Sequence, residues 1–195
     1  MVAWDPQARY DLPTRADRHS RDPRPHTEKA AHSSVAPAPE AVLLPTASVR
    51  VLDSDGNTVF ARALLDSGAQ GSIMSSNLAV RLGNPIYKSS YSIRGVGNVR
   101  ISDVIGHTSF IFSSNPNPRL QFRVSALVMP EVIGRHPPVK VNSYIRSLTS
   151  DLRLADPKFD TPGPVDVLLG ADVLGKLLLT GKRVLHAEGL VAMDT

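Results

Sequence analysis

The chain has no cysteine among its 195 residues. Without thiols it cannot form disulfides, bind zinc through cysteine or use a thiol as a nucleophile. It has no run of about 18 apolar residues and no apolar signal-peptide core at its N-terminus. We therefore expect an intracellular, soluble protein that has no membrane partner.

Aromatic residues and clustered positive charge are also scarce. Only 5% of the residues are aromatic, so the core is expected to consist mainly of Leu, Val, Ile and Ala. The formal net charge is +4, and the basic residues after position 40 are scattered singly apart from Lys182-Arg183. Nucleic-acid binding usually needs a clustered basic face with stacking aromatics. It is therefore not expected, although a structural β-domain whose basic excess binds nucleic acid remains an alternative.

Composition divides the chain near residue 40. Residues 1–40 contain six Lys/Arg, six Asp/Glu and six Pro, with few large aliphatic residues and no helical or strand periodicity. Such a segment cannot bury enough apolar surface to fold. The sequence predicts a disordered leader over residues 1–40 and one folded domain over 41–195.

Short apolar runs separated by turn residues dominate the predicted domain. Strands are expected at Val42–Leu52, Thr58–Leu65, Ser72–Met74, Gly106–Ser113, Leu120–Met129 and Val165–Gly170. A short helix is expected over Leu78–Leu82, ended by Gly83, and a longer one over Ala171–Leu179, closed by Gly181. Because no alternation of strand and long helix is present, the fold class is all-β, either a barrel or a sandwich.

Residues 130–164 interrupt the series of strands. They contain six prolines and a helix-compatible stretch around Tyr144–Leu154. We interpret them as a long, partly helical insertion.

The turn Asp66-Ser67-Gly68 is the first candidate for chemistry. It follows the apolar run Ala63-Leu64-Leu65, so its carboxylate is expected at the end of a buried strand. A carboxylate held in such a place is a candidate for acid/base work. The same three residues also suit an ordinary Asx turn that closes a hairpin, and the residues alone leave both interpretations open.

Two further segments accompany this turn. Gly95-Val96-Gly97-Asn98 lies between the expected strands Tyr91–Arg94 and Val99–Ser102, which indicates a hairpin with a glycine-rich tip. Val167-Leu168-Leu169-Gly170 repeats the pattern of a buried strand that ends in a small residue, and it precedes the late helix.

In this order the three segments resemble the retropepsin family of aspartic proteases, and most closely the protease segment of Bel/Pao-type LTR retrotransposon polyproteins. The blocks that carry the resemblance span about residues 41–195: Leu43-Leu44-Pro45-Thr46-Ala47, Arg62 to Gln70, Leu154-Ala155-Asp156-Pro157 and Val165 to Asp172. The resemblance implies a retropepsin-like closed β-barrel with one C-terminal helix. It further implies a peptide or polyprotein substrate, no cofactor or metal, and a location in the cytoplasm or in retrotransposon particles.

The resemblance also implies residue roles. Asp66 would be the catalytic acid/base, and Ser67 would brace two catalytic loops across a dimer. The remaining roles fall in two groups: Gly68, Leu169 and Gly170 would support the catalytic loop and present its backbone, while Ala69, Gly95, Val96 and Gly97 would contact substrate or form the flap.

Aspartic proteases use two carboxylates that share one proton. This chain has one such motif, since Asp53-Ser54-Asp55-Gly56 lies in a hydrophilic hairpin without an apolar run ahead of it. A homodimer with one Asp66 from each subunit is therefore expected. The alternative is a catalytically inactive module of the same fold that dimerises or binds peptides.

Other polar residues receive plainer interpretations. Gln70 and Ala171 stand where retroviral proteases have an acidic residue and its arginine partner, so this ion pair is missing. Asp172 is expected to have a structural role in the first turn of the late helix. The isolated His107, His136 and His186 are predicted at surface or strand positions rather than at a metal.

Overall fold

The computed structural model describes residues 42–95, 100–101, 103–114, 117–185 and 190–195. These residues belong to one compact unit, Pro39–Thr195. The predicted leader lies outside the described residues, as do Val96 and Gly97 of the predicted flap tip.

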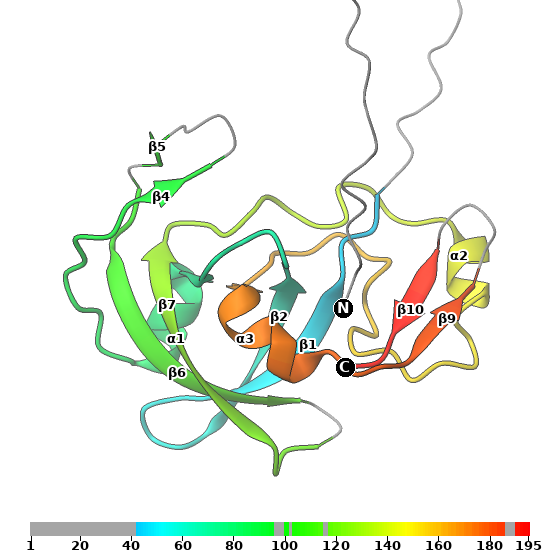
Figure 1. The fold of residues 1–195 in the computed structure, drawn as a ribbon, viewed down its shortest axis with the longest axis horizontal. Coiled ribbons are helices and arrows are strands. Elements are labelled where there is room, and N and C mark those ends of the chain that lie inside the picture. Colours follow the sequence, from blue (N-terminus) through cyan, green and yellow to red (C-terminus); the bar gives the residue numbers. More distant parts are fainter. Residues whose placement is uncertain (1–41, 96–99, 102, 115–116, 186–189) are drawn as a thin grey trace, which may run out of the picture. The chain divides into compact units, whose positions relative to one another are not determined.

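Six strands close into a barrel in the order β1-β2-β8-β3-β7-β6 (Figure 1). Their bounds are Thr46–Leu52 (β1), Thr58–Leu65 (β2), Ser72–Ser75 (β3), Gly106–Ser114 (β6), Gln121–Met129 (β7) and Val167–Leu169 (β8). Neighbouring strands are antiparallel except for the pairs β2–β8 and β3–β7, which are parallel. The all-β prediction is confirmed, and of its two forms the barrel is correct and the sandwich is wrong.

Strand β8 lies between two strands that are consecutive in the sequence. It pairs in parallel with β2, where Leu65 is opposite Leu169, and antiparallel with β3, where Ile73 is opposite Leu168. Residues 66–71, which connect β2 to β3, therefore pass over the end of β8. A strand from the last third of the chain supports the loop that contains Asp66.

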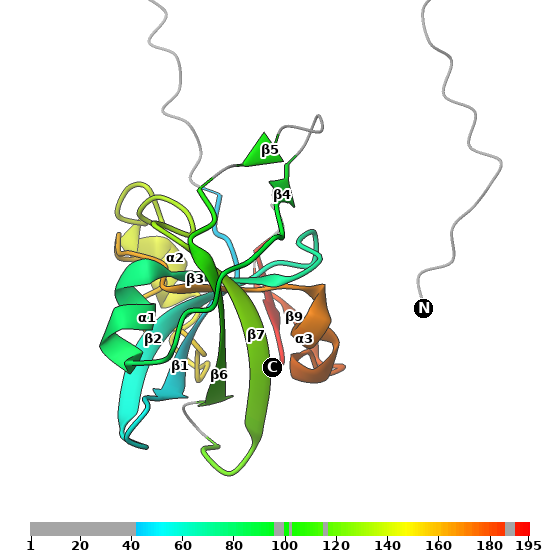
Figure 2. The same ribbon diagram turned by 90° about the vertical axis from the view of Figure 1, so that its left-hand side faces the viewer.

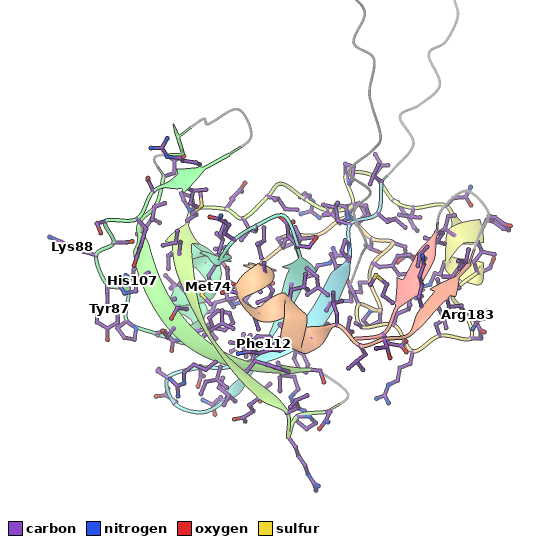
Figure 3. The ribbon with its side chains drawn as sticks, viewed as in Figure 1. Met74, Tyr87, Lys88, His107, Phe112 and Arg183 are labelled. Carbon is purple, nitrogen blue, oxygen red and sulfur yellow. The ribbon has the colours of Figure 1, made fainter. Side chains whose placement is uncertain are left out.

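Aliphatic residues fill the barrel, as the shortage of aromatics predicts. Met74 is fully buried, and Phe112 stacks on Phe122 with ring centroids 5.3 Å apart; Figure 3 labels Met74 and Phe112. A second cluster on the outer side contains Leu64 and Leu168, covered by side chains of the 130–164 insertion. The end of β2 at Ala63-Leu64-Leu65 and all of β8 are largely covered on both faces, so these segments are continuous apolar runs rather than alternating ones.

Helices α1 (Ser76–Leu82) and α3 (Ala171–Leu177) flank the barrel on opposite sides (Figure 2). The Ser75 hydroxyl accepts the Leu78 N–H at the start of α1, and Gly83 ends the helix in the left-handed conformation with φ 64°. Helix α3 ends two residues before the predicted Leu179, because Leu178 is extended and caps the helix without a glycine.

Two small hairpins complete the described elements. Strand β4 (Ile93–Arg94) pairs with β5 (Arg100–Ile101), and β9 (Lys182–Val184) pairs with β10 (Val191–Met193). The pairing of β4 with β5 confirms the predicted hairpin, although β4 begins two residues after the predicted Tyr91; the role of the hairpin as a flap stays a prediction. No helix within the described residues is long and apolar enough to cross a membrane.

The insertion at 130–164 contains one short helix, α2 (Ser143–Ser147). The predicted helical stretch continued to Leu154, but the chain leaves the helix after five residues. Successive tight turns replace it, with the Thr149 N–H bonded to Arg146 and the Leu152 N–H to Thr149. The prediction of a partly helical insertion is confirmed, with a shorter helix.

Candidate active site

Asp66 lies directly after the last residue of β2, and its backbone is fixed by β8. Its N–H donates to the carbonyl of Leu169 at 3.0 Å, which extends the parallel pairing of β2 and β8 by one residue. Its side chain is half-buried. The acidic group is thus placed at the end of a buried strand, as the sequence predicts.

A tight turn holds the carboxylate of Asp66. Its Oδ1 accepts the Gly68 N–H at 2.8 Å, and its carbonyl accepts the Ala69 N–H at 3.4 Å. This is an Asx turn, but it joins β2 to β3, which are not paired with each other, so it closes no hairpin. Among the described residues, no other donor bonds to this carboxylate. Its second oxygen is available to water or to another acid.

Gly170 allows the 66–71 loop to lie against the start of α3. A Cβ atom at this position would lie 2.6 Å from the Gly71 carbonyl oxygen and 2.9 Å from that of Ala69. The Ala171 N–H also donates to the Ala69 carbonyl at 2.8 Å. Leu169 and Gly170 therefore contact the loop that they were predicted to support. Ala69 is half-buried against this segment.

The remaining predicted site residues that the structure describes, Ser67 and Gly95, are exposed. Ser67 is exposed, and its hydroxyl has no hydrogen bond to another described residue. Gly95 is exposed and directly follows β4. Contacts of Ser67 across a dimer and of Gly95 with substrate stay predictions.

Ser72 connects the loop to helix α3, and the sequence did not single it out. The residue is buried, its hydroxyl donates to Oδ1 of Asp172 at 3.0 Å, and it accepts the Gly170 N–H at 3.2 Å. Asp172 lies in the first turn of α3, as predicted. Gln70 and Ala171 cannot form an ion pair. A hydrogen bond from the neutral Ser72 hydroxyl to the Asp172 carboxylate links the loop to the helix instead. A single serine at the start of a predicted strand does not indicate this contact in the sequence.

Arg62 fastens the insertion to the barrel four residues before Asp66. Its guanidinium donates to Oδ2 of Asp156 at 2.6 Å and to the carbonyls of His136 at 2.5 Å and Lys158 at 3.1 Å. The Asp156 carboxylate is buried and also accepts from the Thr46 hydroxyl at 2.7 Å. These contacts join the first, second and third sequence blocks that carry the retropepsin resemblance.

The prediction of a surface or strand position is wrong for His136. It is 5% exposed, because its carbonyl binds Arg62 and its backbone pairs with Gly163 inside the insertion. His107 lies in β6 as predicted, with its ring tilted against Tyr87 (Figure 3), and His186 is outside the described residues. Within the described ranges, no group of three or more His, Cys, Asp or Glu could hold a metal ion.

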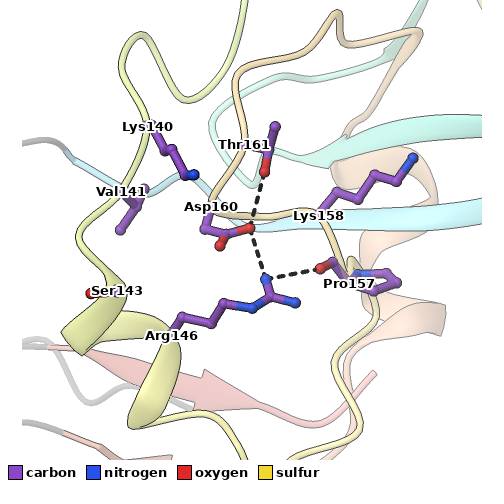
Figure 4. Close-up of a pocket in the computed structure, with 8 residues that line it drawn as sticks. All are labelled: Lys140, Val141, Ser143, Arg146, Pro157, Lys158, Asp160 and Thr161. Carbon is purple, nitrogen blue, oxygen red and sulfur yellow. Dashed lines mark hydrogen bonds and ion pairs between the residues drawn. The ribbon is translucent and has the colours of Figure 1, made fainter.

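A cavity of about 350 Å³ lies inside the insertion, between α2 and residues 157–161 (Figure 4). Arg146 binds Asp160 across it at 2.8 Å, and Lys140 and Lys158 add two further cations to its lining. None of its lining residues belongs to the predicted site. The cavity and the Asp66 loop are therefore separate features.

No protein-family model matches this sequence, and no curated protein matches it. The solved structures that are similar in fold include the following two. EIAV protease complexed with the inhibitor HBY-793 is 17% identical over 76% of this chain and 94% of that chain, with a TM-score of 0.40. The retroviral protease-like domain of Ddi1 from Leishmania major is 18% identical over 70% of this chain and 78% of that chain, with a TM-score of 0.37. Both likenesses are distant.

Proposed function

We propose that this protein is an aspartic endopeptidase of the retropepsin type that cleaves peptide or polyprotein substrates. The observation that supports the proposal is the setting of Asp66. Its backbone is fixed by Leu169, one carboxylate oxygen accepts the Gly68 N–H, and the other has no described partner. A rigidly held, half-buried carboxylate with a free oxygen suits acid/base work on a water molecule.

The proposed active unit is a homodimer. Among the described residues, no second acidic side chain forms a hydrogen bond or ion pair with Asp66. Two carboxylates brought close together share one proton, because both cannot ionise side by side. A second copy of the chain would supply the second Asp66 at a two-fold axis.

The reaction then follows from the shared proton. The ionised Asp66 takes a proton from water as the water oxygen attacks the peptide carbonyl carbon, and the protonated Asp66 of the other subunit gives its proton to the carbonyl oxygen. The tetrahedral diol collapses when the carboxyl group that took the proton of the water gives it to the nitrogen and the C–N bond breaks. The other carboxylate takes a hydroxyl proton from the diol, which restores the shared proton. The hairpin tip at Gly95, Val96 and Gly97 would cover the bound peptide during these steps. A retrotransposon polyprotein of the Bel/Pao type is the proposed substrate.

The test compares two substitutions of similar chemistry. Asp66→Asn is expected to abolish turnover of a peptide library at acidic pH and to leave unfolding and dimerisation nearly unchanged, because the two side chains have similar size. Asp55→Asn is the matched control, since Asp55 also precedes a turn glycine but is exposed in the β1–β2 turn. Cleavage that persists in Asp66→Asn would exclude the proposal, and no turnover in the unmodified chain would favour the inactive module.

Mixing the two forms tests the dimer separately. If each active site needs two Asp66 residues and subunits exchange at random, an equal amount of Asp66→Asn chain should reduce the activity per unmodified chain to about half. Asp55→Asn chain added in the same amount should cause no loss. An active monomer in sedimentation would contradict the dimer.

A further inference from the structure

The side chain of His136 holds the backbone where the chain enters the barrel. The Leu44 N–H, two residues before the start of β1, donates to Nε2 of His136 at 3.1 Å. A ring nitrogen that accepts a hydrogen bond carries no proton, so the contact needs the neutral imidazole with its proton on Nδ1. Protonation of Nε2 would turn two N–H groups toward each other. The contact therefore exists in one protonation state only.

The surroundings of the ring favour the neutral state. Burial lowers the pKa of His136, and the Arg62 guanidinium lowers it further, while the carboxylate of Asp156 acts in the opposite direction. The net result is a pKa below the ordinary 6.5. Among the described residues, the charged groups that act on the His136 ring are Arg62 of β2 and Asp156 of the insertion.

Contacts further along the chain do not use a histidine. The Thr46 hydroxyl donates to Asp156 at 2.7 Å, and the Ser48 N–H donates to the carbonyl of Ala155 at 2.8 Å. They fix β1 to the insertion independently of the imidazole. Loss of the histidine contact would thus free the chain up to Leu44 and leave the barrel closed.

We propose that His136 is an acid-sensitive latch on the segment that leads into the barrel. The neutral ring holds Leu44, and the protonated ring releases residues 42–44. This proposal does not depend on the catalytic role of Asp66.

The sign of the pH effect follows from linkage. The latched ring has a lower pKa than a released, solvated ring, so release is favoured as the pH falls below 6.5. The opening constant should rise by up to about tenfold per pH unit between the two pKa values and level off below the lower one. Above the higher value it should be constant.

Hydrogen exchange of the Leu44 amide in the full chain tests the latch, measured by NMR between about pH 5 and 8 together with the titration of the His136 ring. After correction for the intrinsic exchange rate, Leu44 protection should fall as His136 titrates. In His136→Leu it should be low and independent of pH. In Thr46→Val, which removes a neighbouring contact and keeps the imidazole, the pH dependence should persist.

Three results would overturn the latch. They are Leu44 protection that does not change across the His136 titration, a His136 pKa at or above 6.5, and unchanged protection in His136→Leu. If His136→Leu does not fold, the two titrations of the unmodified chain decide the question by themselves.

Discussion

Replacing Arg62 with methionine should destabilise the fold strongly, because it would strand a buried carboxylate. The Arg62 side chain is 12% exposed and that of Asp156 is 4% exposed. Removing one partner of a buried pair costs about 3–5 kcal/mol. Asp156 would keep the Thr46 hydroxyl and the Lys158 N–H as donors, so we expect a loss near the lower end, about 3 kcal/mol.

Urea denaturation of Arg62→Met and the unmodified chain measures this loss as a change in the free energy of unfolding. Two variants sharpen the result. In an Asp156→Asn background the same substitution should cost at least about 1 kcal/mol less, because no charge is left unpaired. Arg183→Met removes the exposed ion pair with Asp151, in which both side chains are 56% exposed, and should cost less than about 1 kcal/mol.

The reasoning would be refuted if Arg62→Met cost no more than Arg183→Met, or if its cost were the same with and without the charge at Asp156. The first result would mean that the Arg62 network contributes no more than an exposed ion pair. The second would mean that the cost does not come from an unpaired charge on Asp156.

Two further predictions concern the loop around Asp66. Gly170→Ala should be strongly destabilising and should lower peptide turnover, since its Cβ would overlap the Gly71 carbonyl. As a control, Gly175→Ala inside α3 meets no atom within 4 Å and should stabilise by about 0.5–1 kcal/mol in thermal unfolding. Ser72→Ala should cost about 1–3 kcal/mol, because the buried Gly170 N–H loses its acceptor, and an unchanged melting temperature would contradict this role of the hydroxyl.

Local patterns predicted the elements that local chemistry determines. The turn at residues 53–57 forms because Asp53 Oδ1 accepts the N–H groups of Asp55 and Asn57, and Gly56 adopts φ 82°. Ser75 and Gly83 delimit α1 for the same kind of reason. Such signals lie within a few residues of each other and can be recognised in one sequence.

Contacts between distant residues could not be predicted in this way. Arg62 meets Asp156 across 94 positions, and nothing near either residue indicates the other. His136 looked isolated because its partners, Leu44 and Arg62, are 92 and 74 positions away. The residues alone marked Asp66-Ser67-Gly68 as a candidate but left its role open, and only the resemblance implied that Leu169 and Gly170 would support this loop.

The position of β8 also determines when the site can exist. The Ser72 hydroxyl and the Gly170 N–H that stabilise the loop are separated by 98 positions, so the loop closes only after most of the domain has been synthesised. Contacts of this span form slowly, because the entropy of closing a long loop is lost before they are made. During synthesis, β1 and β2 can pair as a local hairpin long before β8 leaves the ribosome. Until then the chain contains the Asp66 side chain but not the backbone of Leu169 and Gly170 that fixes its position.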